Sequence, residues 1–414
     1  MIAALVLAVA GFAADTIEVT PDGAAARAVQ TSPIVASAVG ALAIARGIRA
    51  ESRWPFPSNP QVEFGRVRRQ SSPGIFYDRE WSVGQEVELG GQFIGRNRAS
   101  SALERAGVAR VDDARRLVAL GARRAVASLA VAHRRAALTD SAAQFADRLA
   151  GFATKQFDAG EINRLERNIA ILDAARARSA AERAASASSA AAAELGRLLG
   201  LPRDTAAVAR PLEALPQLRW SSDDRLIELA REHRPDLLAA REFRLAADRF
   251  ARLARLDIMP TLSLNAFSGR EAGTDRLLGV SAGVSIPLFR RQQAAIGEAD
   301  AARSTASADV LASERAVIGE VIAAGAKFAH ARAAEQRFAS DVLRAAAENV
   351  TLTERALAEG EVSLTDVLVL RTTAVATQLE YLEVLREAFD AWFELAAALG
   401  VEPARLSSLL TAGN

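Results

Sequence analysis

The chain has 414 residues, of which 50% are hydrophobic, and its formal net charge is +1 at pH 7. A charge so close to zero gives no electrostatic basis for binding nucleic acid. The sequence contains no cysteine, which excludes disulfides, thiol catalysis and cysteine metal sites. After the N-terminus it has no apolar run of about 18 residues or more, so we expect no transmembrane helix in the mature protein.

Residues 1–14 are predicted to form a secretory signal peptide. Ile2 to Ala10 make an apolar core, and Gly11-Phe12-Ala13 supplies small residues for cleavage after Ala13. A basic segment before the core is missing, so an apolar N-terminal helix is the alternative. The signal is favoured because the apolar run is much shorter than a membrane span.

An internal repeat with a spacing of about 200 residues organises the rest of the chain. The matching pairs are Glu194-Leu195 with Glu394-Leu395, Gly200 with Gly400, Gly160-Glu161-Ile162 with Gly360-Glu361-Val362, Gly84 with Gly283, Leu89 with Leu288, Pro60 with Pro260, and Ser32-Pro33 with Arg234-Pro235. Matches in one order at a nearly constant offset predict two copies of one structural unit. We place these copies at 15–203 and 204–403, with a C-terminal tail at 404–414.

Each copy is predicted to contain the same elements in the same order. These are a helix at 24–52 or 223–256, a β-hairpin at about 60–90 or 260–289, a very long helix at 96–157 or 292–358, a turn at 158–163 or 358–363, and a second helix at 165–199 or 364–399. Roughly 60 residues without proline would make a rod of roughly 90–100 Å. Such a rod is too long for one compact domain and predicts a coiled coil or a helical tube.

The last helix carries a heptad repeat. Its apolar residues at seven-residue spacing are Leu368, Val375, Leu382, Phe389 and Ala396. A strict heptad repeat predicts helices that supercoil against their neighbours. On the helices alone, an ordinary helical bundle or a coiled coil is the simpler interpretation.

Four segments alternate apolar and polar residues with a period of two, which predicts strands with one apolar face. The apolar members are Val62, Phe64, Trp81, Val83, Val87, Leu89, Leu262, Leu264, Ala266, Leu278, Val280, Ala282, Val284, Ile286 and Leu288. The second and fourth segments reach the roughly 9–11 residues that cross a bilayer as a tilted strand. Two soluble hairpins packed on helices are the alternative. The membrane is favoured because small and polar residues fill the other face, as a wet lumen requires.

Aromatic residues near the expected strand ends are typical of the interface girdle of a membrane barrel. They are Trp54, Phe56, Phe76, Tyr77, Trp81 and Phe289. Four strands cannot close a barrel, because an open edge in lipid leaves backbone groups unpaired and at least about eight strands are needed. Three copies would supply twelve strands, and their long helices would continue the barrel as a tube. The sequence therefore predicts a shared, water-filled conduit.

Taken together, these features resemble the TolC-like outer-membrane efflux family over almost the whole mature chain. The residues that carry the resemblance are Arg234-Pro235-Asp236-Leu237, Pro260-Thr261-Leu262, Ser285-Ile286-Pro287-Leu288-Phe289 and Glu359-Gly360-Glu361-Val362-Ser363. The resemblance implies a mostly α-helical homotrimer with a twelve-stranded β-barrel in the outer membrane of a Gram-negative bacterium. It also implies contact with outer-membrane lipid, docking to a periplasmic adaptor and an inner-membrane pump of the RND type, and passive export without enzymatic activity or a cofactor.

A narrower resemblance concerns the segment after the second strand. Glu88-Leu89-Gly90-Gly91 with Arg96 and Arg98 is similar to the CzcC-like heavy-metal efflux branch, which implies export of divalent cations such as cobalt, zinc or cadmium. Gln92 stands where that branch usually carries Lys. A backbone bend between strand and helix explains the two glycines equally well. We predict no metal site, because the three histidines lie too far apart in sequence to form a helical pair.

The helix-tip turns are predicted to contact the adaptor and to surround the channel entrance. Their candidate residues are Asp158, Gly160, Glu359, Gly360 and Ser363, with the two glycines in left-handed conformations that end the helices. Glu161 and Glu361 are expected to be exposed acids at the pore mouth, although the dipole of the following helix explains them equally well.

Asp366 is the remaining entrance candidate. By resemblance it matches an aspartate that lines the closed entrance, and three copies would favour cations. Relatives place a second acid one turn later, where this chain has Val369. A helix-capping aspartate is equally compatible with this position.

Two other kinds of protein remain open alternatives. A soluble periplasmic coiled-coil scaffold would leave the amphipathic strands unexplained. A periplasmic adaptor would carry lipoyl-like and barrel domains, which the sequence does not predict. No catalytic constellation supports an enzyme.

Overall fold

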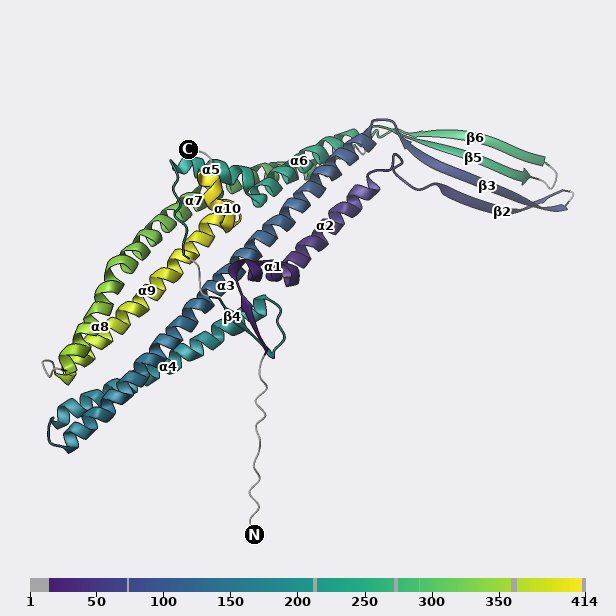
Figure 1. Cartoon of the computed structure of the whole chain (residues 1–414). Helices are drawn as coiled ribbons and strands as arrows, with labels where there is room; N and C mark the ends of the chain where they lie inside the picture. Colours follow the sequence, from purple (N-terminus) through teal and green to yellow (C-terminus); the bar gives the residue numbers. More distant parts are fainter. Residues whose placement is uncertain are drawn as a thin grey trace, which may run out of the picture. The chain divides into compact units, whose positions relative to one another are not determined.

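The computed structural model describes residues 15–72, 74–210, 214–271, 275–289, 291–358 and 363–411 (Figure 1). The expected signal peptide, Met1 to Ala14, lies outside these residues. The described chain divides into two compact units, the first containing residues 15–35, 114–234 and 317–411, and the second containing residues 36–113 and 235–316. Each unit therefore combines segments from both halves of the sequence.

The elements follow the predicted order of helices and hairpins. In chain order they are β1 (Asp15–Val19), α1 (Pro21–Thr31), α2 (Pro33–Glu51), β2 (Gln61–Ser71), β3 (Gly74–Glu88), α3 (Gln92–Asp158), α4 (Arg164–Leu198), β4 (Thr205–Ala209), α5 (Asp223–His233), α6 (Pro235–Leu256), β5 (Thr261–Glu271), β6 (Asp275–Ser285), α7 (Gln293–Arg337), the π-helical segment η1 (Phe338–Val342), α8 (Leu343–Ala358), α9 (Leu364–Ala398) and α10 (Pro403–Thr411). A mostly α-helical chain with two β-hairpins is confirmed.

The two helices predicted before the hairpins are each broken in two. The breaks lie at Ser32 and Arg234, whose ψ angles of 124° and 116° are extended rather than helical. Each residue precedes a proline, whose ring clashes with a helical conformation at the preceding position. The prediction of one continuous helix was therefore wrong in both halves.

The second long helix is also interrupted. It was predicted to run from 292 to 358, but the π-helical segment η1 separates α7 from α8. Neither glycine nor proline occurs between 326 and 358, so composition gives no sign of the change. Single π-helical turns of this kind occur mostly as bulges inside α-helices.

A small parallel sheet was not predicted. Its strands β1 and β4 pair from Asp15 with Thr205 to Val19 with Ala209. Both are only five residues long, and β4 is rich in alanine, so neither is long enough to mark a strand clearly by its alternation of apolar and polar residues.

The first unit shows the internal repeat in its backbone. Helices α4 and α9 both end at a glycine with positive φ, 60° at Gly200 and 72° at Gly400. The amide of Leu201 donates to the Gly196 carbonyl at 2.9 Å, and that of Val401 donates to the Ala396 carbonyl at 3.0 Å. These are equivalent Schellman turns, which satisfy the last carbonyls of each helix.

Two hydrophobic clusters hold the first unit together. One joins α5, α7, α9 and α10 and contains the fully buried Phe328 and Leu395. The other joins β1, α1, α3, α4 and β4 and contains Val126, Leu129 and Leu195. The clusters use corresponding helices of the two repeats. Burial of each large apolar side chain stabilises the fold by roughly 1.5–3 kcal/mol.

The heptad positions of α9 face this interior. Leu368, Leu382, Phe389 and Ala396 are buried and Val375 is half-buried. Phe389 and Phe393 also contribute to a third cluster with Ala127 of α3. The heptad repeat thus marks the packed side of α9, as predicted.

Helix α2 is apolar and long enough, by composition, to cross a membrane. Its apolar residues do not form an uninterrupted run, because Arg46 and Arg49 lie among them. Within the second unit, Leu42 of α2 packs so closely on α3 that a side chain at Gly107 would meet it. Arg49 donates to the Asn97 carbonyl at 2.8 Å. These contacts make α2 part of the helical body.

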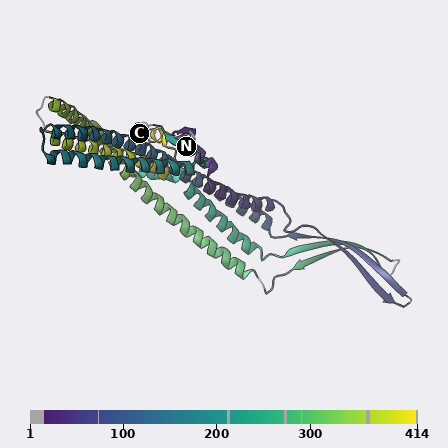
Figure 2. The ribbon, with the colours of Figure 1, turned by 90° about the horizontal axis from the view of Figure 1, so that it is seen from below.

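The second unit also contains one antiparallel four-stranded sheet in the order β2-β3-β5-β6. Each strand pairs with its neighbour over its whole length or nearly so, and the central pair β3 and β5 joins the two repeats. Figure 2 shows the strands extending beyond the ends of the helices to which they connect. The sheet is therefore separate from the helical packing, and this position makes it a candidate working part.

Candidate functional site

The strand register places the apolar side chains on one face of the sheet. Val62 lies opposite Val83, which lies opposite Ala266, which lies opposite Val280. Residues directly opposite one another point to the same side, and so do residues two positions apart along a strand. All apolar members of the predicted alternation that lie within the strands therefore share this face, which we call the apolar face.

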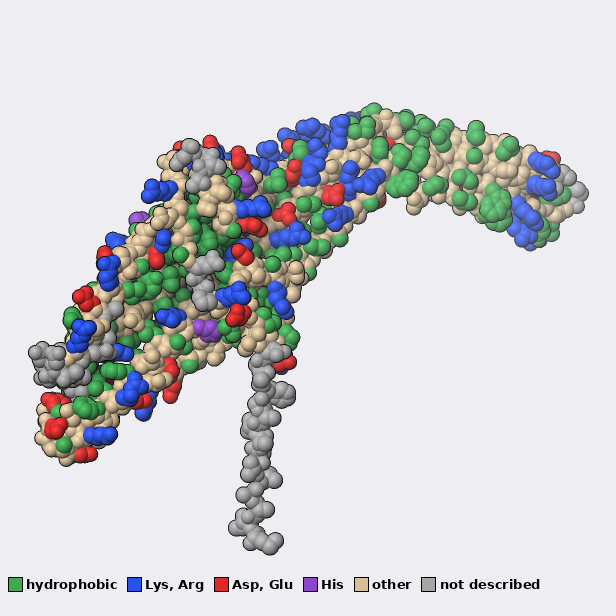
Figure 3. All heavy atoms as spheres, in the orientation of Figure 1, with side chains coloured by type: hydrophobic (Ala, Val, Ile, Leu, Met, Phe, Trp, Pro, Cys, Tyr) green, Lys and Arg blue, Asp and Glu red, His purple; other side chains and the backbone are tan. Residues whose placement is uncertain are grey.

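Nothing in the described chain covers the apolar face. Leu278 and Val280 are 87% and 85% exposed, and Phe64, Val83, Leu264 and Val284 are also exposed. Figure 3 shows hydrophobic and uncharged side chains along much of the sheet, with arginines gathered at its far end. An exposed apolar patch of this kind marks an interaction surface rather than a finished soluble fold.

The opposite face carries mostly polar and small residues, together with Val67, Phe76, Phe267 and Leu277, and we call it the polar face. Asn265 lies over Gly84, where a Cβ atom would be 2.3 Å from its side-chain oxygen. The hydroxyl of Ser263 donates to the Gly283 carbonyl at 3.1 Å. Small residues opposite larger polar ones keep this face hydrophilic and close-packed, which suits contact with water.

The sheet has two open edges. Strand β2 pairs only with β3, and β6 pairs only with β5, within the part of the chain that the structure describes. Each outer strand therefore presents a row of backbone donors and acceptors that need partners.

The predicted interface aromatics fall into three groups. Trp81 and Tyr77 lie on the apolar face, where the Trp81 ring packs 4.6 Å from that of Phe64 and Arg66 lies over Tyr77. Phe76 pairs with Arg69 and lies on the polar face.

The third group lies beside the other end of the strands. Trp54 and Phe56 precede β2 and Phe289 follows β6. Trp54 and Phe289 are 70% and 89% exposed, and Phe56 is also exposed. The aromatics of the apolar face and those of this group thus lie toward opposite ends of the apolar stretch.

The segment with a heavy-metal resemblance forms the junction between β3 and α3. Gly91 has a φ of 75°, and Glu88 forms an ion pair with Arg96 across the bend. The Gln92 side chain is buried, accepts from the Gly90 amide at 2.8 Å and donates to the Leu256 carbonyl at 3.3 Å. These residues have clear structural roles in turning the backbone from strand to helix.

The first helix tip joins α3 to α4. Gly160 has a φ of 77°, and the Glu161 amide donates to the Gln156 carbonyl at 2.9 Å, which closes a Schellman turn. Asn163 and Glu166 then cap α4 reciprocally, in a capping box that was not predicted. Asp158 and Glu161 are both exposed at this tip.

The second tip is described from Ser363 onward. Glu359, Gly360 and Glu361 lie outside the described residues. Ser363 and Asp366 form a capping box at the start of α9, with the Asp366 amide donating to the Ser363 hydroxyl at 3.2 Å and the Ser363 amide donating to the carboxylate at 3.1 Å. Asp366 therefore caps its helix at the position equivalent to Glu166.

Hydrogen bonding also changes the titration of this carboxylate. The Ser363 hydroxyl, followed by the Ser363 backbone amide, holds the pKa of Asp366 below its usual value. The native state thus favours the charged form. Its contribution to stability is present above the pKa of an unfolded aspartate, about 3.9, and is lost as the pH falls through the lower folded value.

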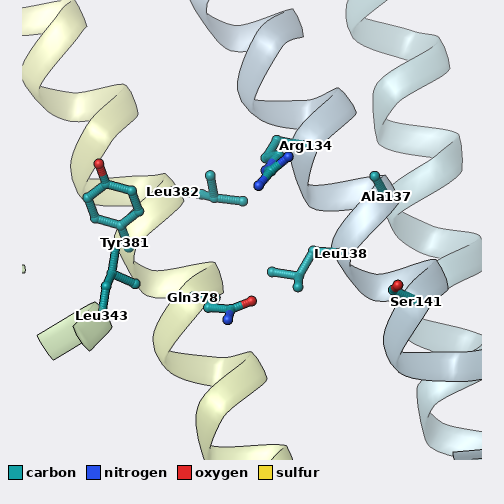
Figure 4. Close-up of a pocket in the computed structure, with 8 residues that line it drawn as sticks. All are labelled: Arg134, Ala137, Leu138, Ser141, Leu343, Gln378, Tyr381 and Leu382. Atoms are coloured by element: carbon teal, nitrogen blue, oxygen red, sulfur yellow. The ribbon is translucent and has the colours of Figure 1, made fainter. Parts of the chain in front are cut away.

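A cavity of about 500 Å³ in the first unit was not predicted. In Figure 4, Arg134 and Leu138 of α3 extend toward Gln378 and Leu382 of α9. Leu343, which follows the π-helical segment, also lines it. Burial, and then the nearby Glu335, raises the pKa of Tyr381 at its edge. The cavity is lined by residues from helices that are distant in sequence, so no local sequence motif predicts it.

Among the described residues, no group of three or more His, Asp or Glu side chains is placed to hold a metal ion. The described side chains thus offer no built site for a resident cation.

Comparison with known proteins agrees with this geometry. Residues 226–401 match the family described as "Outer membrane efflux protein". No curated protein gives a significant match to the sequence. Three similar solved structures are the outer membrane protein VceC from Vibrio cholerae (TM-score 0.77, 18% identity, covering 92% of this chain and 96% of that one), a membrane protein from Pseudomonas aeruginosa (0.76, 20%, 91% and 89%) and CusC (0.75, 17%, 92% and 92%).

At these identities the structural likeness shows the fold alone, and the family match concerns residues 226–401. The matched residues include α6, β5 and β6, and therefore half of the exposed sheet. Residues 226–401 thus match the outer membrane efflux protein family, and about nine-tenths of the chain shares its fold with VceC, CusC and the Pseudomonas aeruginosa membrane protein.

Proposed function

We propose that the chain is one subunit of a homotrimeric channel that carries solutes passively through the outer membrane. One observation carries this proposal: the sheet is exposed on its apolar face and open at both edges. In lipid an apolar face is stable, but an unpaired strand edge is not. Identical copies that pair β6 of one chain with β2 of the next remove both edges and leave the polar face around a lumen.

Three copies give a barrel of twelve strands, and the helices continue it on the periplasmic side. The strands connect to helices at one end and to short turns at the other. We propose that the turns face the cell surface. We propose that the turns at 158–163 and 358–363 form the periplasmic end of the assembly. We place the contact with a periplasmic adaptor there, and beyond it an inner-membrane pump of the RND type.

The assembly is tested by fractionation and gel mobility. The protein is expected in the outer-membrane fraction as a trimer that dissociates only on heating, and to conduct in planar bilayers. A detergent-extracted protein that is monomeric and does not conduct would contradict the channel and favour the soluble scaffold.

Cations are the cargo that the strands support best. Every acidic residue within the described strands of the sheet lies on the polar face: Glu63, Asp78, Glu80, Glu86, Glu88, Glu271 and Asp275. Acidic residues along a pore favour cations. Divalent metal ions, which the resemblance at 88–98 suggests, form one such class. A deletion strain with unchanged tolerance of zinc, cobalt and cadmium would remove that narrower assignment.

Asp366 is proposed to line the entrance as well as to cap α9. Replacement with Asn keeps an oxygen that accepts from the Ser363 amide but removes three charges per trimer. Asp366→Asn and Asp366→Ala are both expected to lower the cation-to-anion permeability ratio roughly twofold, the effect of losing one acidic ring. The measurement is the reversal potential across a planar bilayer under a salt gradient.

A matched control separates this local effect from loss of charge in general. Glu228→Gln removes the same charge from the exposed surface of α5 and is expected to leave selectivity unchanged. If Asp366→Asn is as silent as the control, while Asp366→Ala lowers only the stability, the residue is a cap and not part of the entrance.

A further inference from the structure

Four arginines form an unbroken row across the sheet. Arg66 lies directly opposite Arg79, Arg79 opposite Arg270, and Arg270 opposite Arg276. Opposite residues have Cβ atoms about 4.5–5.5 Å apart, and like charges at that distance repel. All four side chains are exposed. We call these residues the arginine row.

The row lies on the apolar face, where the sheet offers it no acid. The described strands carry all their acidic residues on the opposite face, where Arg69 pairs with Asp78 and Glu271. On the apolar face, Arg66 lies 4.5 Å from the centre of the Tyr77 ring. Four positive charges in a line repel one another and, with no carboxylate on their side of the described strands, attract an anion from outside the chain.

The position of the arginine row indicates the chemical class of the anion that would bind it. The next row on the same face contains Phe64, Trp81 and Leu278, so the arginines border the apolar residues directly. They also lie at the end of the strands that carries the turns, away from the helices. Two residues along a strand advance about 6.8 Å, so one ligand can reach both rows. That ligand combines acyl chains with an anionic head.

We propose that the arginine row binds the phosphate groups of a phosphorylated glycolipid in the outer leaflet of the membrane. This inference rests on the proposed function, which places the apolar face in lipid and the turns at the cell surface. Guanidinium groups suit phosphate because they donate two parallel hydrogen bonds and keep their charge at every physiological pH. A homotrimer would present twelve such arginines as a belt around the barrel.

The test measures retention of lipid by the purified trimer with native mass spectrometry. The probes are bisphosphorylated lipid A and the same lipid with both phosphates removed. The wild-type trimer is expected to retain at least about tenfold more of the phosphorylated form. The combined Arg→Gln variant at 66, 79, 270 and 276 is expected to lose that preference, and the corresponding Arg→Lys variant to keep part of it because charge remains.

The control variant removes the same number of charges elsewhere. Arg→Gln at 203, 231, 252 and 315 changes four exposed arginines outside the strands and is expected to retain lipid like the wild type. Equal retention of both lipids by the wild-type trimer, or an undiminished preference in the row variant, overturns the inference. The wild-type comparison decides the matter even if the row variant does not assemble.

Conductance keeps the two proposals apart. Wild type and row variant are both expected to conduct in planar bilayers of neutral lipid, because the row lies outside the lumen. A wild-type protein that conducts but does not prefer the phosphorylated lipid would contradict only the proposal that the arginine row binds phosphate. A wild-type protein that neither conducts nor forms a trimer would contradict the channel proposal, and the proposed lipid site would fall with it.

Discussion

Ala282→Arg is expected to abolish assembly in the outer membrane, whereas Ser281→Arg, one residue away, is expected to be tolerated. Both side chains are exposed on β6, but the register places Ala282 between Val280 and Val284 on the apolar face and Ser281 on the polar face. Arginine on the lipid-facing side of a barrel costs about 2–4 kcal/mol at the middle of the bilayer. In a homotrimer that cost applies three times.

The comparison is informative because the two positions are otherwise matched. They share a strand, a strand environment and exposure in the isolated chain, and each substitution adds the same side chain. The amount of heat-dissociable trimer in the outer-membrane fraction is the measurement. If both variants assemble equally well, the apolar face is in contact with water and the sheet does not form part of a membrane-spanning barrel.

Gly400→Ala is expected to destabilise the helical unit by about 2–5 kcal/mol, and Gly160→Ala by only about 1–2 kcal/mol. Both glycines have φ above 70°, which costs an L-residue about 1–2 kcal/mol. Only at Gly400 is the space also filled: a Cβ atom there would lie 2.7 Å from the His233 carbonyl oxygen and 2.9 Å from the Arg234 Cα. Overpacking of this kind adds about 1–3 kcal/mol.

Chemical denaturation in detergent, followed by circular dichroism at a helical wavelength, measures the difference. The backbone penalty is common to both variants, so the gap between them reports the contact of the Gly400 turn with the junction between α5 and α6. Equal denaturation midpoints of the two variants would show that the junction shifts to make room for the added methyl group. The junction would then not fix the end of α9.

Periodicity explains which parts of the fold were predictable from sequence. The strands and long helices were predicted because their apolar residues recur with a period of two or of seven, and burial or pairing enforces those periods. The breaks at Ser32 and Arg234 were missed although each precedes a proline, because the helical pattern continues on both sides. The strands β1 and β4 are too short to show a clear period and depend on pairing between segments distant in sequence.

The candidate site was predictable to the extent that its signals are local. Asn163 and Glu166 follow the capping-box spacing and were open to prediction. The arginine row was not, because Arg79 and Arg270 become neighbours only through a register between hairpins of different repeats. The cavity beside Tyr381 likewise depends on how α3, α8 and α9 pack, which no single segment encodes.

The two unpaired outer strands have a consequence for the protein before it reaches its destination. A single copy has two unpaired strand edges and one exposed apolar face. Such a surface can start aggregation as readily as correct assembly. A newly exported copy is therefore expected to need either a chaperone or rapid pairing of its outer strands to avoid aggregation.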